Sequence, residues 1–177
     1  LVCLVGSEMC IRDRIKRFIK DKKEIVVKPL DGMGGKSIYK LDKIQESEIE
    51  TLLKMTNNES TQIITQEFIE DIYEGDFRIL IIHGKPFKKT LARIPQGDSF
   101  KGNLAAGGKG VVKDISDFQF EMASEIGDFL IQKDINFAGI DVIGNFLTEI
   151  NVTSPTCARQ ILDQSGENPI QEYFEKL

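Results

Sequence analysis

The stretch AGIDVIGNFLTEINV, residues 138–152, is the part of the sequence that says most about the fold. Apolar runs on both sides of its Gly144 predict a β-hairpin. In the second strand, Glu149 and Asn151 are two residues apart, so their side chains lie on the same face. Asp141 lies on the first strand, and its face depends on how the two strands pair.

The length of the hairpin loop decides this pairing. A two-residue loop at 144–145 would pair Asp141 with Thr148 and send Glu149 to the other face, whereas a three-residue loop at 144–146 would pair Asp141 with Glu149. Opposed carboxylates repel, and Mg²⁺, which prefers carboxylate and amide oxygens, would remove that cost. The hairpin is therefore either a metal site or a polar face in solvent.

The sequence around this hairpin predicts an α+β protein. Helices are predicted, from apolar residues at helical spacing, at residues 15–22, 46–55, 118–133, 156–164 and 169–177. Strands are predicted at residues 24–28, 37–41, 62–68, 77–82, 87–94, 138–143 and 147–152. Strands and helices do not alternate strictly, which disfavours a Rossmann-type sheet.

Two glycine-rich segments are candidates for ligand contact. The first follows the strand that ends with Lys28, and its glycines would let backbone N–H groups approach a phosphate while Lys28 adds a charge. It is not a Walker A loop, because Leu30 stands where that motif needs glycine. The second, residues 94–110, contains five glycines and predicts a long mobile loop, either a lid or a disordered segment. For the glycine-rich segment after Lys28, the alternative is an ordinary turn without a ligand.

The composition excludes several classes of protein. A net charge of -5 disfavours a nucleic-acid binder, and no apolar run is long enough for a membrane span. The single histidine, His83, is predicted to be a solvated turn residue, which leaves no multi-histidine metal site. Three cysteines without ligand or disulfide spacing indicate a reduced, cytoplasmic protein. Residues 1–14 look like a non-native or adapter-like leader and are set aside.

Four segments closely resemble signature stretches of the prokaryotic glutathione synthetase family. They are KPLDGMGGKSIY at 28–39, GDFRILII at 75–82, LARIPQGDSFKGNLAAGGKG at 91–110 and GIDVIGNFLTEINVTSPT at 139–156. The resemblance implies the ATP-grasp fold, in which two α+β lobes hold ATP between them. The lobes would be a partial central lobe at residues 15–70 and a C-terminal catalytic lobe at 71–177, with the family's N-terminal domain absent.

The resemblance also implies roles for three groups of residues. The residues implied to bind ATP are Lys28, Gly32, Gly34, Gly35, Gln66, Glu67, Phe68, Ile69, Asn103, Gly107 and Gly108. The residues implied to face the acyl phosphate and the substrate carboxylates are Arg78 and Arg93. The residues implied to hold two Mg²⁺ (or Mn²⁺) ions are Asp141, Glu149 and Asn151.

The reaction implied by the resemblance joins gamma-glutamylcysteine to glycine through an acyl phosphate, with ATP as co-substrate and release of ADP and phosphate. The whole protein of the family is usually a homo-oligomer, and its N-terminal domain supplies part of the dipeptide site, so activity of these residues alone stays open. Three alternatives remain: another ATP-grasp carboxylate–amine ligase, an inactive nucleotide-binding module, and a structural or interaction protein.

Overall fold

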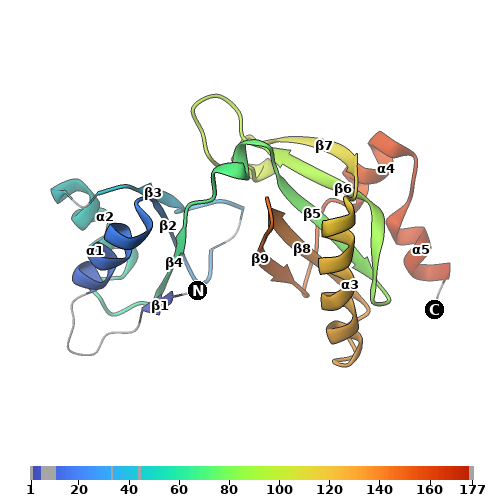
Figure 1. The fold of residues 1–177 in the computed structure, drawn as a ribbon, viewed down its shortest axis with the longest axis horizontal. Coiled ribbons are helices and arrows are strands. Elements are labelled where there is room, and N and C mark those ends of the chain that lie inside the picture. The colour runs from blue at the N-terminus through green and yellow to red at the C-terminus, as the bar shows by residue number, and fades with distance from the viewer. Residues whose placement is uncertain (1, 5–10, 33, 44, 176–177) are drawn as a thin grey trace. The chain divides into compact units, whose positions relative to one another are not determined.

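The computed structural model describes residues 2–4, 11–32, 34–43 and 45–175. The chain divides into two compact units, Leu1–Ile69 and Glu70–Leu177 (Figure 1). In both units, an antiparallel sheet packs against helices, so the α+β class predicted from the sequence is confirmed. None of the helices in the described ranges is long and apolar enough to cross a membrane.

The first unit is a four-stranded sheet with two helices on one face. Its strands, in the order β1-β4-β2-β3, are β1 (Val2–Leu4), β2 (Ile25–Pro29), β3 (Tyr39–Leu41) and β4 (Ile63–Glu67). Its helices are α1 (Ile11–Lys22) and α2 (Glu46–Met55). Because side chains alternate along a strand, Ile25 and Val27 pack with Ile15 and Leu52 of the helices. Lys28 is left to the opposite face, together with Gln66, which pairs with Val26.

The second unit is a five-stranded antiparallel sheet in the order β7-β6-β5-β8-β9. The strands are β5 (Asp76–Ile82), β6 (Lys85–Ile94), β7 (Lys109–Asp114), β8 (Phe137–Ile143) and β9 (Phe146–Asn151). The helices are α3 (Asp117–Ile131), α4 (Ala158–Ser165) and α5 (Pro169–Glu175), with short 3-10 turns η1 (Glu70–Tyr73) and η2 (Leu104–Ala106).

Helices cover the two faces of this sheet to different extents. Ile79 and Ile140 belong to the face that packs under α3 (Figure 1), which begins where the Ser116 hydroxyl accepts a hydrogen bond from the Gln119 N–H at 3.2 Å. Leu80 and Leu91 belong to the other face and pack with Ile161 of α4. Helices α4 and α5 cover only one end of that face, and the rest of it holds charged side chains.

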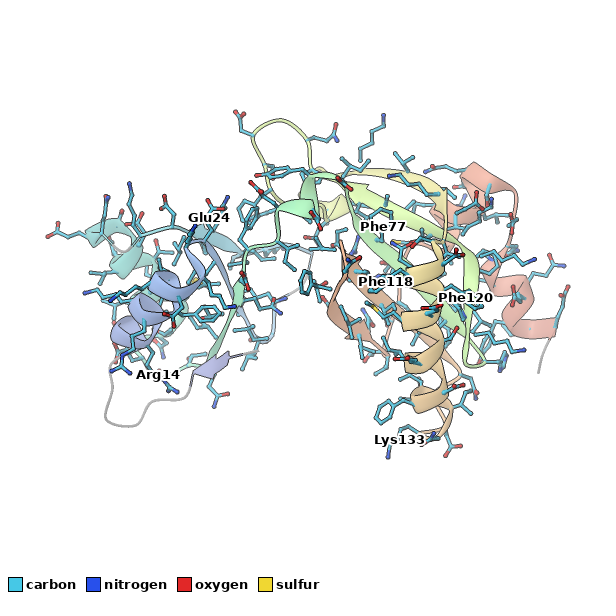
Figure 2. All side chains as sticks on the ribbon, in the orientation of Figure 1. Arg14, Glu24, Phe77, Phe118, Phe120 and Lys133 are labelled. Carbon is cyan, nitrogen blue, oxygen red and sulfur yellow. The ribbon has the colours of Figure 1, made fainter. Side chains whose placement is uncertain are left out.

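Two aromatic side chains of α3 are not part of this core. Phe118 and Phe120 extend from the first turns of the helix and are 44% and 49% exposed (Figure 2). Their neighbours Gln119 and Ala123 are buried against the sheet. The buried face of α3 is thus narrower than its apolar composition suggests.

Three predictions from the sequence need correction. Strand β7 was missed, so the irregular segment after β6 ends at residue 108 and contains η2. His83 is a turn residue, with φ 46°, but it is half-buried rather than fully solvated, because its ring stacks on Tyr173 at 4.9 Å between centroids. Helix α1 begins at Ile11 and β1 at Val2, inside the segment set aside as a leader. Cys10 lies outside the described residues.

Candidate active site

The β8–β9 hairpin combines features of both registers considered from the sequence. Its loop has two residues, because Ile143 pairs with Phe146, and Gly144 takes the positive φ of 55° that such tight loops need. A β-bulge then adds Thr148 to β9, and the Thr148 hydroxyl donates a hydrogen bond to the Asp141 carbonyl at 3.1 Å. Asp141 consequently pairs with Glu149, and their side chains lie on the same face.

Four buried charged side chains lie beside this hairpin, and we call them the charge quartet: Asp76, Arg78, Arg93 and Asp141. Arg78 donates to both carboxylate oxygens of Asp141, from Nε to Oδ1 and from Nη2 to Oδ2 at 2.9 Å. Arg93 Nη2 lies 2.6 Å from Asp76 Oδ2 and 2.9 Å from Asp141 Oδ2. All four residues are at most 8% exposed.

The strand register brings the quartet together. Asp76 pairs with Arg93 across β5 and β6, and Arg78 pairs with Asp141 across β5 and β8. Opposite charges at directly paired positions attract across a sheet. Gly139 makes room for the Arg78 side chain, because a Cβ at that position would lie 3.0 Å from Arg78 Cδ. Pairing across the strands and the absence of a side chain at Gly139 therefore allow the quartet to form.

The quartet is formally neutral, but its two carboxylates differ. Burial raises the pKa of Asp76 to about 6, with a further contribution from the negative charge of Asp141 and opposition from Arg93. Burial acts in the same direction on Asp141, but the hydrogen bonds from Arg78 and the charge of Arg93 outweigh it, so the pKa of Asp141 is lowered. Asp76 Oδ1 is buried and has no hydrogen-bond partner among the described residues.

The three candidate metal ligands occupy different environments. Asp141 is fully engaged by the two arginines, Glu149 is exposed, and Asn151 Oδ1 accepts a hydrogen bond from the Ser154 N–H at 3.2 Å. Each carboxylate oxygen has two lone pairs, so Asp141 can bind a cation while it keeps an arginine. Two carboxylates and an amide oxygen on one sheet face suit Mg²⁺. The residues present therefore fit a magnesium site.

The candidate nucleotide-binding residues of the first unit lie on or next to its sheet. Lys28 and Gln66 share the face away from the helices, whereas the Glu67 carboxylate pairs with Lys22 at 2.9 Å. Lys40 Nζ lies 3.7 Å from the centre of the Phe68 ring, and Ile69 ends the unit. The glycine turn contains Gly34 and Gly35 at φ 64° and 77°, and Gly32 lies against Pro29; Met33 falls outside the described residues.

The loop between β6 and β7 is closed by its own backbone. The Asn103 carbonyl accepts hydrogen bonds from Ala106 N–H at 2.9 Å and from Gly108 N–H at 3.1 Å, and Gly107 ends η2 with φ 94°. Gly102 lies directly against the Arg93 carbonyl, where a Cβ would collide. The segment with Asn103, Gly107 and Gly108 is thus attached to the strand end that carries Arg93.

Asp76 was missed in the sequence analysis. The signal was present, because an aspartate and an arginine stand two residues apart in an otherwise apolar strand, GDFRILII, and so share a face. Thr156 also enters the site, with its hydroxyl 3.5 Å from Arg78 Nη1.

Solved structures define the class of fold. The ATP-grasp ligase PsnB, in a complex with its minimal precursor, Mg and ADP, superposes with a TM-score of 0.66 at 13% identity, over 99% of this chain and 51% of that one. D-alanyl-alanine synthetase A from Vibrio cholerae O1 biovar eltor gives 0.65 at 14% identity, over 99% of this chain and 56% of that one. At such identities the likeness shows the fold alone, and the chain has the ATP-grasp fold.

The family follows from sequence similarity. The chain belongs to the family of the prokaryotic glutathione synthetase ATP-grasp domain, whose model matches residues 5–166, and the resemblance stated from the sequence is confirmed. The glutathione synthetase of Xylella fastidiosa strain 9a5c is 42% identical over 163 residues, 92% of this chain and 52% of the relative. The chain thus spans about half the length of the curated relatives that it matches. The origin of residues 1–14 stays a prediction.

Proposed function

We propose that the chain is the ATP-binding and catalytic part of a glutathione synthetase, which joins gamma-glutamylcysteine to glycine and releases ADP and phosphate. Membership of the family supports this proposal, as does the 42% identity to proteins with that name. The observation that carries it is the charge quartet, in which two buried arginines lie beside a carboxylate paired with Glu149. Such a cluster suits a reaction between anionic partners.

The arginines have a direct chemical task in this proposal. A carboxylate is a poor electrophile, so the dipeptide carboxylate would first take the γ-phosphoryl group of ATP, and the glycine amine would then displace phosphate from the acyl phosphate. Negative charge on the transferring group needs fixed positive charge. Asp141 holds Arg78, and Asp141 and Asp76 together hold Arg93. Burial acts to lower the pKa of each arginine, but the neighbouring carboxylates outweigh it and raise the pKa, so both arginines stay cationic.

Asp141, Glu149 and Asn151 would hold Mg²⁺ (or Mn²⁺). A bound divalent ion would neutralise part of the charge on the ATP phosphates. Glu149 is exposed and free to turn toward a cation, while Asp141 adds an oxygen that two arginines already orient. The residues of this face would thus bind metal and substrate oxygens side by side.

Lys28 and the glycine turn would contact the phosphates, and residues 66–69 would contact the adenine through backbone groups. The segment with Asn103, Gly107 and Gly108 would cover the acyl phosphate and exclude water, which would otherwise hydrolyse it. Its attachment to the Arg93 carbonyl through Gly102 supports a role close to the arginines. In the cell, we place the protein in the cytoplasm as part of a homo-oligomer.

A product assay tests the proposed function. ADP release would be measured with Mg²⁺-ATP, gamma-glutamylcysteine and glycine, and with each substrate omitted in turn. The proposal predicts release that requires both gamma-glutamylcysteine and glycine. It also predicts loss of this release in Arg93→Lys but not in Lys113→Arg, a change at an exposed position of β7. Release that requires two D-alanines instead would contradict the assigned substrates.

A further inference from the structure

Asp141 has two roles that compete for its carboxylate oxygens. In the structure, both of its carboxylate oxygens contact arginines, Oδ1 with Arg78 and Oδ2 with Arg78 and Arg93. In the proposed function, the same carboxylate also binds a metal. A metal that draws Asp141 toward Glu149 weakens at least one of these arginine contacts.

The two arginines depend on Asp141 to different degrees. Arg78 Nε and Nη2 both donate to Asp141, and among the described residues its other hydrogen bond is a long one, from Nη1 to the Thr156 hydroxyl at 3.5 Å. Arg93 has a second anchor, because its Nη2 lies 2.6 Å from Asp76 Oδ2, and its Nε donates to the Asp76 carbonyl at 3.3 Å. The loss of Asp141 would leave Arg93 held, whereas it would release Arg78.

Asp76 is itself fixed by its surroundings. It pairs directly with Arg93 across the strands, and its neighbour Gly75 lies against Ala92, where an added Cβ would stand 3.2 Å from the Ala92 Cβ. On its other side, Gly102 packs against both the Asp76 Cβ and the Arg93 carbonyl. Close packing of Gly75 and Gly102 thus surrounds the pair on both sides.

We propose that Asp76 is a positioning residue that holds Arg93 independently of Asp141, so that Asp141 can bind a metal without release of Arg93. The metal part of this inference rests on the proposed function, but the division of labour between the carboxylates does not. The shortest contact of Arg93 with each of its two carboxylates is made by Nη2, and its Nε donates to the Asp76 carbonyl. Asp76 would therefore keep one substrate-facing cation in place throughout the reaction.

Nuclear magnetic resonance on the metal-free chain tests the division of labour. Hydrogen exchange of the Nε–Hε groups of Arg78 and Arg93, assigned with Arg78→Lys and Arg93→Lys, would be compared in wild type, Asp76→Asn and Asp141→Asn. We expect exchange at Arg93 to accelerate roughly tenfold or more in D76N and little in D141N, and the reverse at Arg78, because a buried arginine without its counter-charge loosens. Loss of Arg93 protection in a folded D141N would overturn the proposal, even if D76N failed to fold.

Nucleotide titration tests the metal part. In D76N, the affinity for ATP should fall by a larger factor with Mg²⁺ than without it, since only the metal removes Asp141 from Arg93. An equal factor in both conditions would contradict the metal part of the proposal, in which the metal draws Asp141 away from Arg93. If wild type binds no nucleotide under either condition, the proposed function fails for this chain, and the exchange rates alone decide the role of Asp76.

Discussion

The two faces of the five-stranded sheet come from the same strands, yet one forms the apolar core and the other holds the charge quartet. Alternate residues of β5 and β8 put Ile79 and Ile140 under α3 and put Arg78 and Asp141 on the opposite face. One face is apolar and buried by a helix, and the other is covered by helices only at one end. Alternation of side chains along each strand thus places the residues that stabilise the sheet and the residues of the candidate site on opposite faces.

The largest effect should come from the charged face. Asp141→Ala leaves two buried arginines without their shared carboxylate, and we expect a loss of about 3–5 kcal/mol in the free energy of unfolding. Nucleotide binding should be lost as well. Urea unfolding followed by circular dichroism measures the first, and a loss below about 1 kcal/mol would mean that the quartet is not structurally coupled.

The matched change on the apolar face is Ile140→Ala, one residue away on β8. The cavity should cost about 2–5 kcal/mol of the free energy of unfolding, but affinity for Mg²⁺-ATP should stay near that of wild type under folding conditions. The same urea experiment and a nucleotide titration measure both. Loss of nucleotide affinity in a folded I140A chain would show that the two faces are not separable.

The sequence predicted the fold well because its signals are local. The helix expected at 46–55 is observed at Glu46–Met55, and the hairpins lie within one or two residues of their expected positions. Apolar spacing, glycine and loop residues report on neighbours in the chain, so they suffice for such elements. Strand β7 was missed because its Val111-Val112 pair is too short to stand out beside glycine and lysine.

The candidate site could be predicted only in part. The sequence indicated Arg78, Arg93 and Asp141, but not that the three form one network with Asp76, since that depends on pairing across three strands. The register of Asp141 and Glu149 depends on a bulge at Thr148, for which the local sequence has no distinctive residue. The residue pattern of a single strand does not determine which distant strand it pairs with or in which register.

A pH dependence should distinguish the faces further. The pKa of Asp76 is raised from 3.8 to about 6, so the folded chain binds more protons than the unfolded chain in this window. Stability contributed by Asp76 is therefore present below pH 3.8 and lost as the pH rises through about 6. Between pH 4.5 and 7, the free energy of unfolding of wild type should fall by about 1–3 kcal/mol more than that of Asp76→Asn. Urea unfolding at each pH measures this difference, and the same pH dependence of stability in both proteins would argue against a raised pKa at Asp76.

The smallest effect on stability should come from Glu149. This side chain is exposed, so Glu149→Gln should change the free energy of unfolding by no more than about 0.5 kcal/mol. Unfolding in urea checks this expectation. A larger loss of stability would mean that Glu149 supports the hairpin. Weaker binding of Mg²⁺-ATP by E149Q could then not be assigned to the loss of a metal ligand.

The most direct test of the account is a calorimetric titration of Mg²⁺-ATP into wild type, Glu149→Gln and the control Glu125→Gln, an exposed position on α3. We predict that wild type and E125Q bind alike and that E149Q binds at least roughly tenfold more weakly, as expected when a metal site is disturbed. Equal binding by all three would show that the charged face does not hold the metal–nucleotide complex, and the central claim would be wrong.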